Sequence, residues 1–586
     1  MDEQLEDACD NYLRTAFTEA DKKQIQDLLD TKDYIELRKR MLPRITFGTS
    51  GLRSKMEAGY ARMNDLTVFQ ASEGLRDYIL STVPDAKSRG IVVGHDHRFN
   101  SQRFAQIVQA VFAPSMKVFV FGTLVHTPLV PFAVKTLGAA CGVMITASHN
   151  PKQDNGYKVY GENSCAIIPP HDRLISEAIE AAISKNPKPE VDFESSLASL
   201  ENVYEAMTKA YFGALFQAVG RLNQGTTTPS KPFKFCYTPM HGVGLIYARV
   251  AMSSSSQSTG PSEMITVADQ AYPDPEFSTV KFPNPEEAGA LDLAMQTADE
   301  EGISIIVATD PDADRLGVAE KVDGKWRILT GNQIGTLLAS HLIQSSQEEP
   351  KRAMLSSTVS SKILQAIGEK EGIHWEETLT GFKWLGNRAL SLREAGYNVI
   401  LAYEEALGFL PCDIVYDKDG ILSMAVLLNF TRTLYASGRT LSDELTRLYR
   451  TYGYFQSSNS YFIVPDPPLL ARIMASLRDP RYPDSLNHRP VTRVRDLTRG
   501  YDSSTEDHVP SLPTSKSSEM ITFWFSPAAD EFESATMTIR GSGTEPKLKY
   551  YIEARSTSTE KASAAAQAIE RDLIQVWFKD FTLQRP

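Results

Sequence analysis

Five apolar runs that end in polar residues constrain the fold of this chain more than any other feature. They are "IVVG" (91–94), "KVFVFG" (117–122), "CGVMITA" (141–147), "ISIIVATD" (303–310) and "YNVILAY" (397–403). Such uninterrupted runs are typical of strands buried on both faces, which occur where helices cover a parallel sheet. A helical pattern such as "HDRLISEAIEAAISK" (171–185) lies between them. The alternation predicts an α/β protein.

The C-terminal part of the chain has a different character. "ATMTIRGSGTEPKLKYYIEA" (535–554) reads as strand, glycine-rich turn and strand, and the helical pattern "EKASAAAQAIERDLIQVWF" follows it. This order predicts an α+β module with an antiparallel sheet. A chain of 586 residues is long enough for several domains, and we expect three to five.

Charge and cysteine usage exclude some classes of function. The formal net charge is -12, whereas binding to nucleic acid requires a basic face. The five cysteines are scattered, with no C-x-x-C spacing, which is typical of reduced thiols in the cytosol. The N-terminus lacks a secretion signal, and no apolar segment approaches the length of a membrane span. We therefore expect a soluble cytoplasmic protein that binds neither nucleic acid nor membranes.

The stretch "TASHNPKQDNGYKVYG" (146–161) follows one of the buried strands directly. It places Ser148 beside His149, with Pro151 fixing the turn behind them. A solvent-exposed loop would have this composition, and so would a serine presented as a nucleophile, which needs a neighbouring group to activate it. Lys158, on the next predicted strand, would supply positive charge to such a site.

The loop "ATDPDADRLG" (308–317) carries three alternating carboxylates, Asp310, Asp312 and Asp314. They follow a buried strand, and sites in α/β sheets lie outside the carboxyl ends of strands. Three carboxylates that converge can bind a hard cation, and all-oxygen ligation favours Mg²⁺. An EF-hand is excluded because Arg315 and Lys321 stand where its glycine and glutamate are required. A solvated acidic turn is the other interpretation.

The third informative loop is "RGSGTEPKLKYY" (540–551). Its glycines allow successive backbone amides to face an anion, and Arg540 supplies a planar fork that matches phosphate. The candidate anion ligands are Arg540, Ser542, Gly543, Thr544, Lys547 and Lys549. A plain Gly-Ser hairpin is the alternative, and the spacing of a Walker loop is absent.

Four weaker loops complete the pattern: "RITFGTSGLRSKM" (44–56) with Arg53, "GHDHR" (94–98) with Arg98, "GFKWLGNR" (381–388) and "YEEALGF" (403–409) with Glu404. Paired glutamates usually belong to a solvated face, but here they end a buried-type strand, where they could bind sugar hydroxyls. A serine nucleophile, a hard cation and a distant anion clamp together indicate phosphoryl transfer.

These motifs also identify a family. "TASHNP" with "DNGYK", "DPDADR", "YEEALG" and "GSGTEP" resemble the α-D-phosphohexomutase superfamily in the same order from about residue 44 to 556. "FGTSGLR", "YTPMHGVG" (237–244), "GFKWLGN" and the "DKDG" that follows "EEALGF" resemble its eukaryotic phosphopentomutase/phosphoglucomutase branch. The resemblance implies three α/β mixed-sheet domains and a C-terminal α+β domain around a central cleft. We expect their boundaries at residues 1–205, 206–322, 323–455 and 456–586.

The resemblance also implies the roles of individual residues. Ser148 would carry the phosphoryl group, and phosphorylated Ser148 with Asp310, Asp312 and Asp314 would hold Mg²⁺. His149, Lys158 and Lys383 are the acid/base candidates, and Arg53 would lie near the phosphoserine. The substrate-binding residues would be Glu404, Arg315, Arg540, Ser542, Gly543, Thr544 and Lys549.

The expected reaction is the interconversion of a sugar 1-phosphate with its 5- or 6-phosphate, with a sugar bisphosphate as intermediate and activator. Ala406 stands where many hexose-handling relatives carry serine, which favours ribose and deoxyribose phosphates, with glucose phosphate as a second substrate. The alternatives are a glucose 1,6-bisphosphate synthase, a serine-dependent phosphatase and a catalytically silent sensor. A monomer is expected, with a dimer as the alternative.

Overall fold

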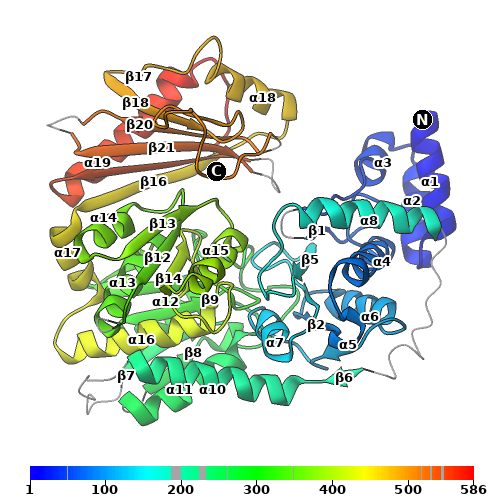
Figure 1. The fold of residues 1–586 in the computed structure, drawn as a ribbon, viewed down its shortest axis with the longest axis horizontal. Coiled ribbons are helices and arrows are strands. Elements are labelled where there is room, and N and C mark those ends of the chain that lie inside the picture. Colours follow the sequence, from blue (N-terminus) through cyan, green and yellow to red (C-terminus); the bar gives the residue numbers. More distant parts are fainter. Residues whose placement is uncertain are drawn as a thin grey trace. The chain divides into compact units, whose positions relative to one another are not determined.

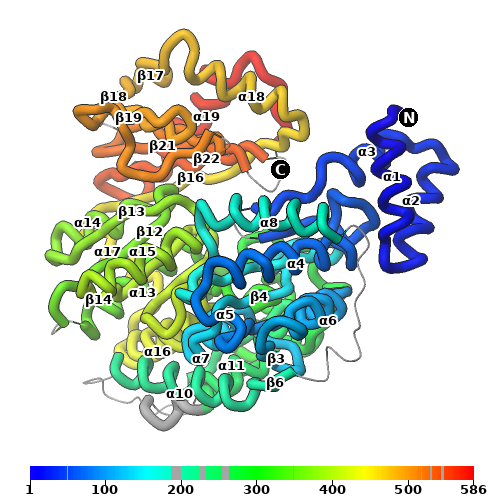
Figure 2. Tube along the Cα trace, turned by 45° about the vertical axis from the view of Figure 1, so that its right-hand side comes forward, coloured from blue at the N-terminus to red at the C-terminus, as the bar shows by residue number. Residues whose placement is uncertain are grey.

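The computed structural model describes residues 1–48, 51–186, 200–222, 233–259, 262–346, 349–516, 518–527, 531–542 and 547–585. The chain divides into two compact units (Figures 1 and 2). The first comprises Met1–Arg352 and Gly381–Ser442, and the second Ala353–Thr380 and Asp443–Pro586. The predicted boundaries of four domains stay a prediction.

The first sheet of unit 1 has the strand order β1-β5-β4-β2-β3-β6. Its strands are β1 (Leu52–Lys55), β2 (Ile91–His95), β3 (Val118–Val120), β4 (Cys141–Ile145), β5 (Asp154–Tyr160) and β6 (Glu201–Asn202). The central strand β2 is parallel to β3 and β4, whereas β5 is antiparallel to β1 and β4. The chain therefore returns through β5 directly after the serine stretch.

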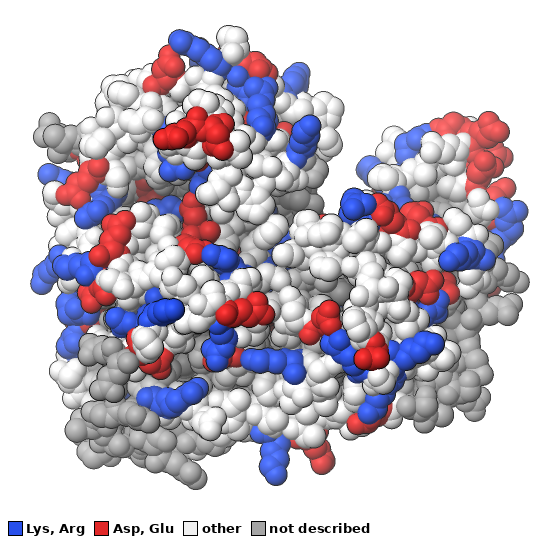
Figure 3. All heavy atoms as spheres, in the orientation of Figure 1, with Lys and Arg blue, Asp and Glu red and all other residues white. Residues whose placement is uncertain are grey.

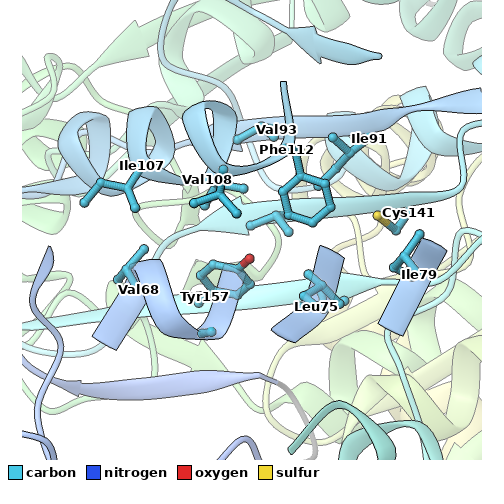
Figure 4. Packing of buried hydrophobic residues seen from close by; sticks show 14 of the residues in the cluster. Val68, Leu75, Ile79, Ile91, Val93, Ile107, Val108, Phe112, Cys141 and Tyr157 are labelled. Carbon is cyan, nitrogen blue, oxygen red and sulfur yellow. The ribbon is translucent and has the colours of Figure 1, made fainter. Parts of the chain in front are cut away.

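Helices cover both faces of this sheet. On one face lie α4 (Asp65–Thr82), α6 (Ser101–Phe112) and α8 (His171–Lys185), with α8 alongside α4 in both views (Figures 1 and 2). Val68 and Leu75 of α4 belong to one buried cluster with Phe112 of α6 and Ile91 of β2 (Figure 4). On the other face α7 (Leu129–Leu137) comes so close that a Cβ atom on Gly142 would lie 2.6 Å from the Val134 side chain.

The second sheet of unit 1 has the order β11-β10-β9-β7-β8. Its strands are β7 (Phe233–Thr238), β8 (Ser262–Thr266), β9 (Ile305–Thr309), β10 (Leu316–Val322) and β11 (Lys325–Leu329). The helices near it are α10 (Tyr204–Leu222), α11 (Gly244–Thr259), η1 (Ala268–Gln270) and α12 (Asp292–Glu300). As in the first sheet, the buried strand β9 has a parallel neighbour, β7, and an antiparallel one, β10.

Two further groups of elements complete unit 1, one late in its sequence and one at its N-terminus. The antiparallel pair β14 (Asn398–Glu404) and β15 (Gly408–Leu410) is accompanied by α13 (Gly331–Ser345), α15 (Phe382–Glu394) and α16 (Gly420–Ala436). At the N-terminus α1 (Glu3–Thr15), α2 (Glu19–Asp30) and α3 (Tyr34–Met41) form a small core of their own, and α5 (Ala86–Arg89) is a single turn. Acidic side chains gather over α1 in the space-filling view (Figure 3).

Unit 2 is built on an antiparallel sheet of order β16-β22-β21-β20-β18-β17, with β19 paired to β18. Its strands are β16 (Tyr454–Ile463), β17 (Ser485–Leu486), β18 (Arg489–Asp496), β19 (Tyr501–Asp502), β20 (Met520–Phe525), β21 (Ser534–Gly541) and β22 (Lys547–Ser556). Helices α18 (Pro467–Ser476), α19 (Thr559–Asp572) and η2 (Leu573–Trp577) belong to this region. The parallel pair β12 (Arg352–Ser357) and β13 (His374–Thr378), α14 (Ile363–Glu371) and most of α17 (Leu441–Tyr452) complete it.

The predicted α/β class and the antiparallel C-terminal sheet are confirmed. The mixed sheets that the family resemblance implied are confirmed too: β4 and β9 each have one parallel and one antiparallel neighbour, and β14 is antiparallel to β15. Burial of both faces fixes only that helices cover the sheet, not the direction of the next strand. A short polar loop brings the chain back beside β4 and β9, so the serine stretch and the aspartate stretch are both hairpin loops.

Candidate active site

The first candidate loop connects β4 to β5 and contains Ser148. The Ser148 amide donates to Thr146 Oγ1 at 2.9 Å, and the Asn150 amide donates to the Ala147 carbonyl at 3.0 Å. Ser148 has φ of 53°, in the left-handed region that costs a non-glycine residue energy and is found mainly at functional sites. Its side chain is buried.

The second candidate loop connects β9 to β10 and carries the three aspartates. Asp310, Asp312 and Asp314 are each 0% exposed, and one carboxylate oxygen of each lies within 4.8 Å of the other two. The Arg315 amide donates to Asp310 Oδ1 at 3.0 Å, which fixes the carboxylate that opens the loop. The prediction that the three carboxylates converge is confirmed, and a solvated acidic turn is excluded.

The two loops meet inside unit 1. Ser148 Oγ donates to Asp310 Oδ2 at 2.7 Å. Lys158 Nζ donates to Asp312 Oδ2 at 2.8 Å and to Asp314 Oδ2 at 2.9 Å. The serine, the three carboxylates and the lysine that the sequence singled out therefore form one cluster.

The carboxylate cluster fits a hard cation. Asp312 Oδ1 and Asp314 Oδ1 are buried, and neither has a hydrogen-bond partner among the described residues. A buried carboxylate oxygen without a donor is costly unless a cation takes that place. The donor set is oxygen only, which suits Mg²⁺ better than a softer metal. The residues that would hold the ion are Asp310, Asp312 and Asp314, beside Ser148.

The local electrostatics shift the pKa values of Asp312 and Asp310 in opposite directions. Burial opposes ionisation of Asp312, but Lys158 and hydrogen bonds from Lys158 and Thr127 outweigh it and hold the pKa of Asp312 well below its usual value. Burial and the charges of Asp312 and Asp314 raise the pKa of Asp310 well above its usual value. The raised pKa of Asp310 means that more positive charge is needed to ionise it, which is a second reason to expect a cation.

His149 and Lys158 differ in protonation. Burial, then the charges of Arg315 and Arg53, lower the pKa of His149 well below its usual value, so its imidazole is neutral at pH 7. Its Nδ1 lies 3.3 Å from Ser148 Oγ. Burial disfavours the charged form of Lys158, but Asp312 and Asp314 outweigh burial and raise its pKa. His149 can accept a proton at this site, whereas Lys158 remains a cation.

The other predicted residues of unit 1 surround the cluster. Arg53 on β1 donates to Asn150 Oδ1 at 3.2 Å. Arg315 donates to the Ala406 carbonyl at 2.9 Å. Glu404 is buried at the end of β14; burial raises its pKa, against the opposing charges of Lys418 and Arg315. Lys383 is buried in the first turn of α15, with Nζ 5.2 Å from the centroid of the Trp384 ring. Its catalytic role stays a prediction.

The predicted phosphate clamp belongs to unit 2. Arg540 on β21 lies opposite Lys549 on β22 in the strand register, and the Ser542 amide donates to the Lys547 carbonyl at 2.9 Å. Gly543 and Thr544 lie outside the described residues. The strand-turn-strand form predicted around "GSGTEP" is present up to the edges of the turn, and binding of an anion there stays a prediction.

Sequence reasoning missed two residues that contact the cluster, Thr127 and Lys418, and a hydrogen bond beside them. Thr127, just before α7, donates through Oγ1 to Asp312 Oδ2 at 2.6 Å. Lys418 Nζ lies 3.1 Å from Asp314 Oδ2. Asp417, the residue before Lys418, accepts a hydrogen bond from the Tyr160 hydroxyl at 3.0 Å. Lys418 lies in the "DKDG" motif, which could have drawn attention to it, whereas Thr127 has no local signal.

The α/β unit brings together a serine, an acidic site for a cation and a lysine that keeps its charge. This fold and this site define a class of phosphoryl-transfer enzymes. Three consecutive family models match the chain: phosphoglucomutase/phosphomannomutase α/β/α domain I over residues 44–186, domain II over 209–324 and domain III over 330–452. The chain belongs to the phosphoglucomutase/phosphomannomutase family, a group of phosphomutases.

Individual relatives narrow the comparison. The chain is 45% identical to a probable phosphoribomutase of Schizosaccharomyces pombe, over 99% of this chain and 98% of that protein. It is 39% identical to the glucose 1,6-bisphosphate synthase of Homo sapiens, over 99% of this chain and 94% of that protein. A solved structure of a phosphomannomutase from Thermus thermophilus, at 24% identity, covers 91% of this chain and 100% of that chain with a TM-score of 0.64. The structural likeness concerns the fold.

Proposed function

We propose that this protein is a phosphomutase that moves a phosphoryl group between C1 and C5 of ribose phosphate through a phosphoserine at Ser148. The observation that carries this proposal is the contact of Ser148 Oγ with Asp310 Oδ2 at 2.7 Å, beside two carboxylates that Lys158 bridges. A bound Mg²⁺ would neutralise charge on the transferring group, which is the largest contribution to phosphoryl transfer.

In the first transfer the bond between Ser148 Oγ and phosphorus breaks, and a bond from phosphorus to a sugar hydroxyl oxygen forms. The proton of that hydroxyl goes to a base, and neutral His149 is the better candidate than protonated Lys158. The leaving oxygen, Ser148 Oγ, takes a proton from His149, whose Nδ1 lies 3.3 Å away. A phosphoryl dianion at the site would oppose the arginine charges that depress the pKa of His149, so the imidazole becomes a stronger base when substrate is present.

In the second transfer the bisphosphate has turned over within the site. The bond between its other phosphate and the sugar oxygen breaks, and a bond from that phosphorus to Ser148 Oγ forms. The Ser148 hydroxyl gives its proton to His149, and the sugar oxygen takes a proton from His149. Lys158 keeps its charge through both steps and stays with Asp312 and Asp314. We propose that Arg540, Ser542, Gly543, Thr544 and Lys549 hold the phosphate that is not reacting, and that Glu404 and Arg315 bind the sugar phosphate.

Related expectations belong to the same proposal. A sugar bisphosphate would activate the enzyme by phosphorylating Ser148, and the chain would act as a monomer on small sugar phosphates. A cytoplasmic location is supported by five cysteines that are all free. No helix of the described part of the chain has the length and apolarity that a membrane crossing needs.

The substrate is tested by comparing rates with ribose 1-phosphate and glucose 1-phosphate, each primed with the same sugar bisphosphate. The similarity to a phosphoribomutase supports ribose, and we expect a higher kcat/KM for ribose 1-phosphate. A higher kcat/KM for glucose 1-phosphate would contradict the assignment to pentoses.

The second candidate is a sugar bisphosphate synthase, supported by 39% identity to the human glucose 1,6-bisphosphate synthase. A synthase is distinguished from a mutase by an assay that supplies both 1,3-bisphosphoglycerate and glucose 1-phosphate. A mutase interconverts the monophosphates and accumulates little bisphosphate, whereas a synthase accumulates glucose 1,6-bisphosphate faster than it isomerises the monophosphate.

A further inference from the structure

The motif "GHDHR" has no role in the reaction described above, yet its arginine lies directly behind the serine loop. The Arg98 side chain is 0% exposed. It donates to four backbone carbonyls: those of Ser148 at 2.5 Å, Asn150 at 2.6 Å and Pro151 at 2.9 Å in the loop, and that of Asp154 at 3.3 Å at the start of β5. A guanidinium has five donors in a rigid fork, so one side chain can fix the course of the whole loop.

The guanidinium is itself held in place. Its Nε lies 3.3 Å from Asp96 Oδ2, and Asp96 Oδ1 accepts the Arg98 amide at 2.9 Å and Ser101 Oγ at 2.5 Å. Asp96 thereby fixes Arg98 to the end of β2 and the start of α6. Both elements belong to the buried core of the first sheet, so the loop is tied to its most rigid part.

A segment of the second sheet's region covers the same guanidinium. The Phe277 ring centroid lies 5.0 Å from Arg98 Cζ and 5.3 Å from the His97 ring. The turn that presents Phe277 is fixed by Asp274, which accepts from the amides of Glu276 and Ser278. A cation over an aromatic face is attracted to it, and the ring excludes water from the guanidinium.

A second unexplained motif, "YTPMHGVG", links this turn to the aspartate loop. The His241 carbonyl accepts the Asp274 amide at 2.9 Å, and the Val243 amide donates to the Pro311 carbonyl at 2.9 Å. A Cβ atom on Gly242 would lie 2.3 Å from Pro311 Cα, so only glycine fits between them. The motif therefore fixes both the turn with Phe277 and the loop with the metal-site carboxylates.

We propose that Arg98 is a positioning residue for phosphoryl transfer: it holds Ser148 in its left-handed conformation and, through Phe277, in register with the aspartate loop. The inference rests on the proposed function, because it assigns Arg98 to the transfer step of that reaction. Every Arg98 contact with the loop is to backbone, so the residue acts on the direction of Ser148 Oγ and not on the substrate. Its loss should therefore lower kcat and leave KM nearly unchanged.

The test compares Arg98→Lys with Arg89→Lys. Lysine keeps the charge at position 98 but cannot span four carbonyls. Arg89 is a matched control because it also donates to backbone carbonyls in the same sheet region, at Gly138 and Ala139, away from Ser148. The measurements are kcat and KM with ribose 1-phosphate, the rate at which glucose 1,6-bisphosphate phosphorylates Ser148 (read by intact mass), and thermal unfolding.

We expect Arg98→Lys to lower kcat and the Ser148 phosphorylation rate by about 10- to 100-fold, the effect of misplacing a reacting atom by about 1 Å. KM should stay within about threefold, and Arg89→Lys should match the wild type. A kcat within about threefold of the wild type would overturn the inference. A rise in KM with unchanged phosphorylation of Ser148 would also overturn it, because Arg98 would then serve substrate binding.

If Arg98→Lys does not fold, the variant Phe277→Leu tests the inference instead. This variant should lower kcat by several-fold at constant KM, and an unchanged kcat would overturn the inference. Failure of the proposed function looks different. In that case glucose 1,6-bisphosphate would phosphorylate Ser148 of the wild type, but the protein would isomerise no sugar phosphate. The effect of Arg98→Lys would then still be measured by the rate of Ser148 phosphorylation. Wild-type protein that never becomes phosphorylated on Ser148 would overturn both.

Discussion

Replacing Thr127 with valine isolates a single hydrogen bond to a metal-site carboxylate. Thr127 is 0% exposed, and its Oγ1 donates to Asp312 Oδ2 at 2.6 Å. Valine keeps the shape of the side chain, and the backbone bond from the Thr127 amide to the Asp312 carbonyl, at 2.9 Å, is retained. The change therefore removes one donor from the carboxylate and leaves its backbone position in place.

The magnitude follows from the charge and burial of this bond. A hydrogen bond to a charged group contributes about 1.5–3 kcal/mol. Without it Lys158 remains a donor to Asp312 Oδ2, but the carboxylate is held less firmly in the orientation that turns Oδ1 to the cation site. The Asp312 carboxylate also loses one of the groups that stabilise its ionised form, although Lys158, the larger contributor, is retained. Since about 1.4 kcal/mol corresponds to a factor of ten, we expect the Mg²⁺ activation constant to rise about 10- to 100-fold.

The assay is a titration of isomerase activity with Mg²⁺ at saturating substrate, for the wild type, Thr127→Val and Thr127→Ser. Serine retains the hydroxyl, so its activation constant should stay near that of the wild type, whereas the maximal rate of the valine variant should largely recover at high Mg²⁺. If the activation constants of Thr127→Val and the wild type agree within twofold, this hydrogen bond does not orient the metal-site carboxylate and the reasoning is refuted.

Three further predictions concern other buried groups. Ser148→Ala should abolish isomerisation and phosphorylation while ribose 1-phosphate still raises the Tm; measurable turnover would exclude a phosphoserine. Lys158→Met leaves the charges of Asp312 and Asp314 unbalanced, so without added cation the free energy of unfolding should fall by about 3–5 kcal/mol, and an unchanged urea midpoint would contradict this. Burial raises the pKa of Glu553 to about 7, so the folded state favours its protonated form, and stability is lost as pH rises from about 4.5 to 7. Glu553→Gln should remove this loss, which makes the variant more stable than the wild type by up to about 3 kcal/mol at pH 8 and similar at pH 4; the same difference at both pH values would argue against it.

The sequence predicted the residues whose signal is local. Ser148 and the three aspartates each follow an apolar strand, where sites in α/β sheets lie, so each loop was predicted from pattern and chemistry. That the two loops meet was implied only by the family resemblance, because β4 and β9 belong to different sheets. Lys158 was predicted for the same reason, because it lies on the strand that returns from the serine loop.

Residues that act across long sequence separations were not predictable in this way. Thr127 carries no repeat, spacing or composition that points to the site. Arg98 and Lys418 lie in motifs that the sequence singled out, but nothing in those motifs indicates what the two side chains contact. Each becomes visible only through a contact with a distant segment, such as that between Thr127 and Asp312. The antiparallel neighbours of β4 and β9 were expected only from the family resemblance, because burial reports the layers around a strand and not the direction of the chain beside it.

The two hairpin loops explain how one cluster of side chains can serve both transfers of a mutase. A serine that gives up a phosphoryl group and later recovers it must present the same geometry twice, with the substrate reversed between the two events. Ser148 and Ala313 each take a left-handed conformation, with φ of 53° and 55°, inside a loop whose two strands are paired in a sheet. Paired strands on both sides leave such a loop few alternative conformations, and Arg98 and Thr127 remove more of them through hydrogen bonds. Because groups fixed in this way need no reorganisation at each transfer, the same site can serve both halves of the reaction.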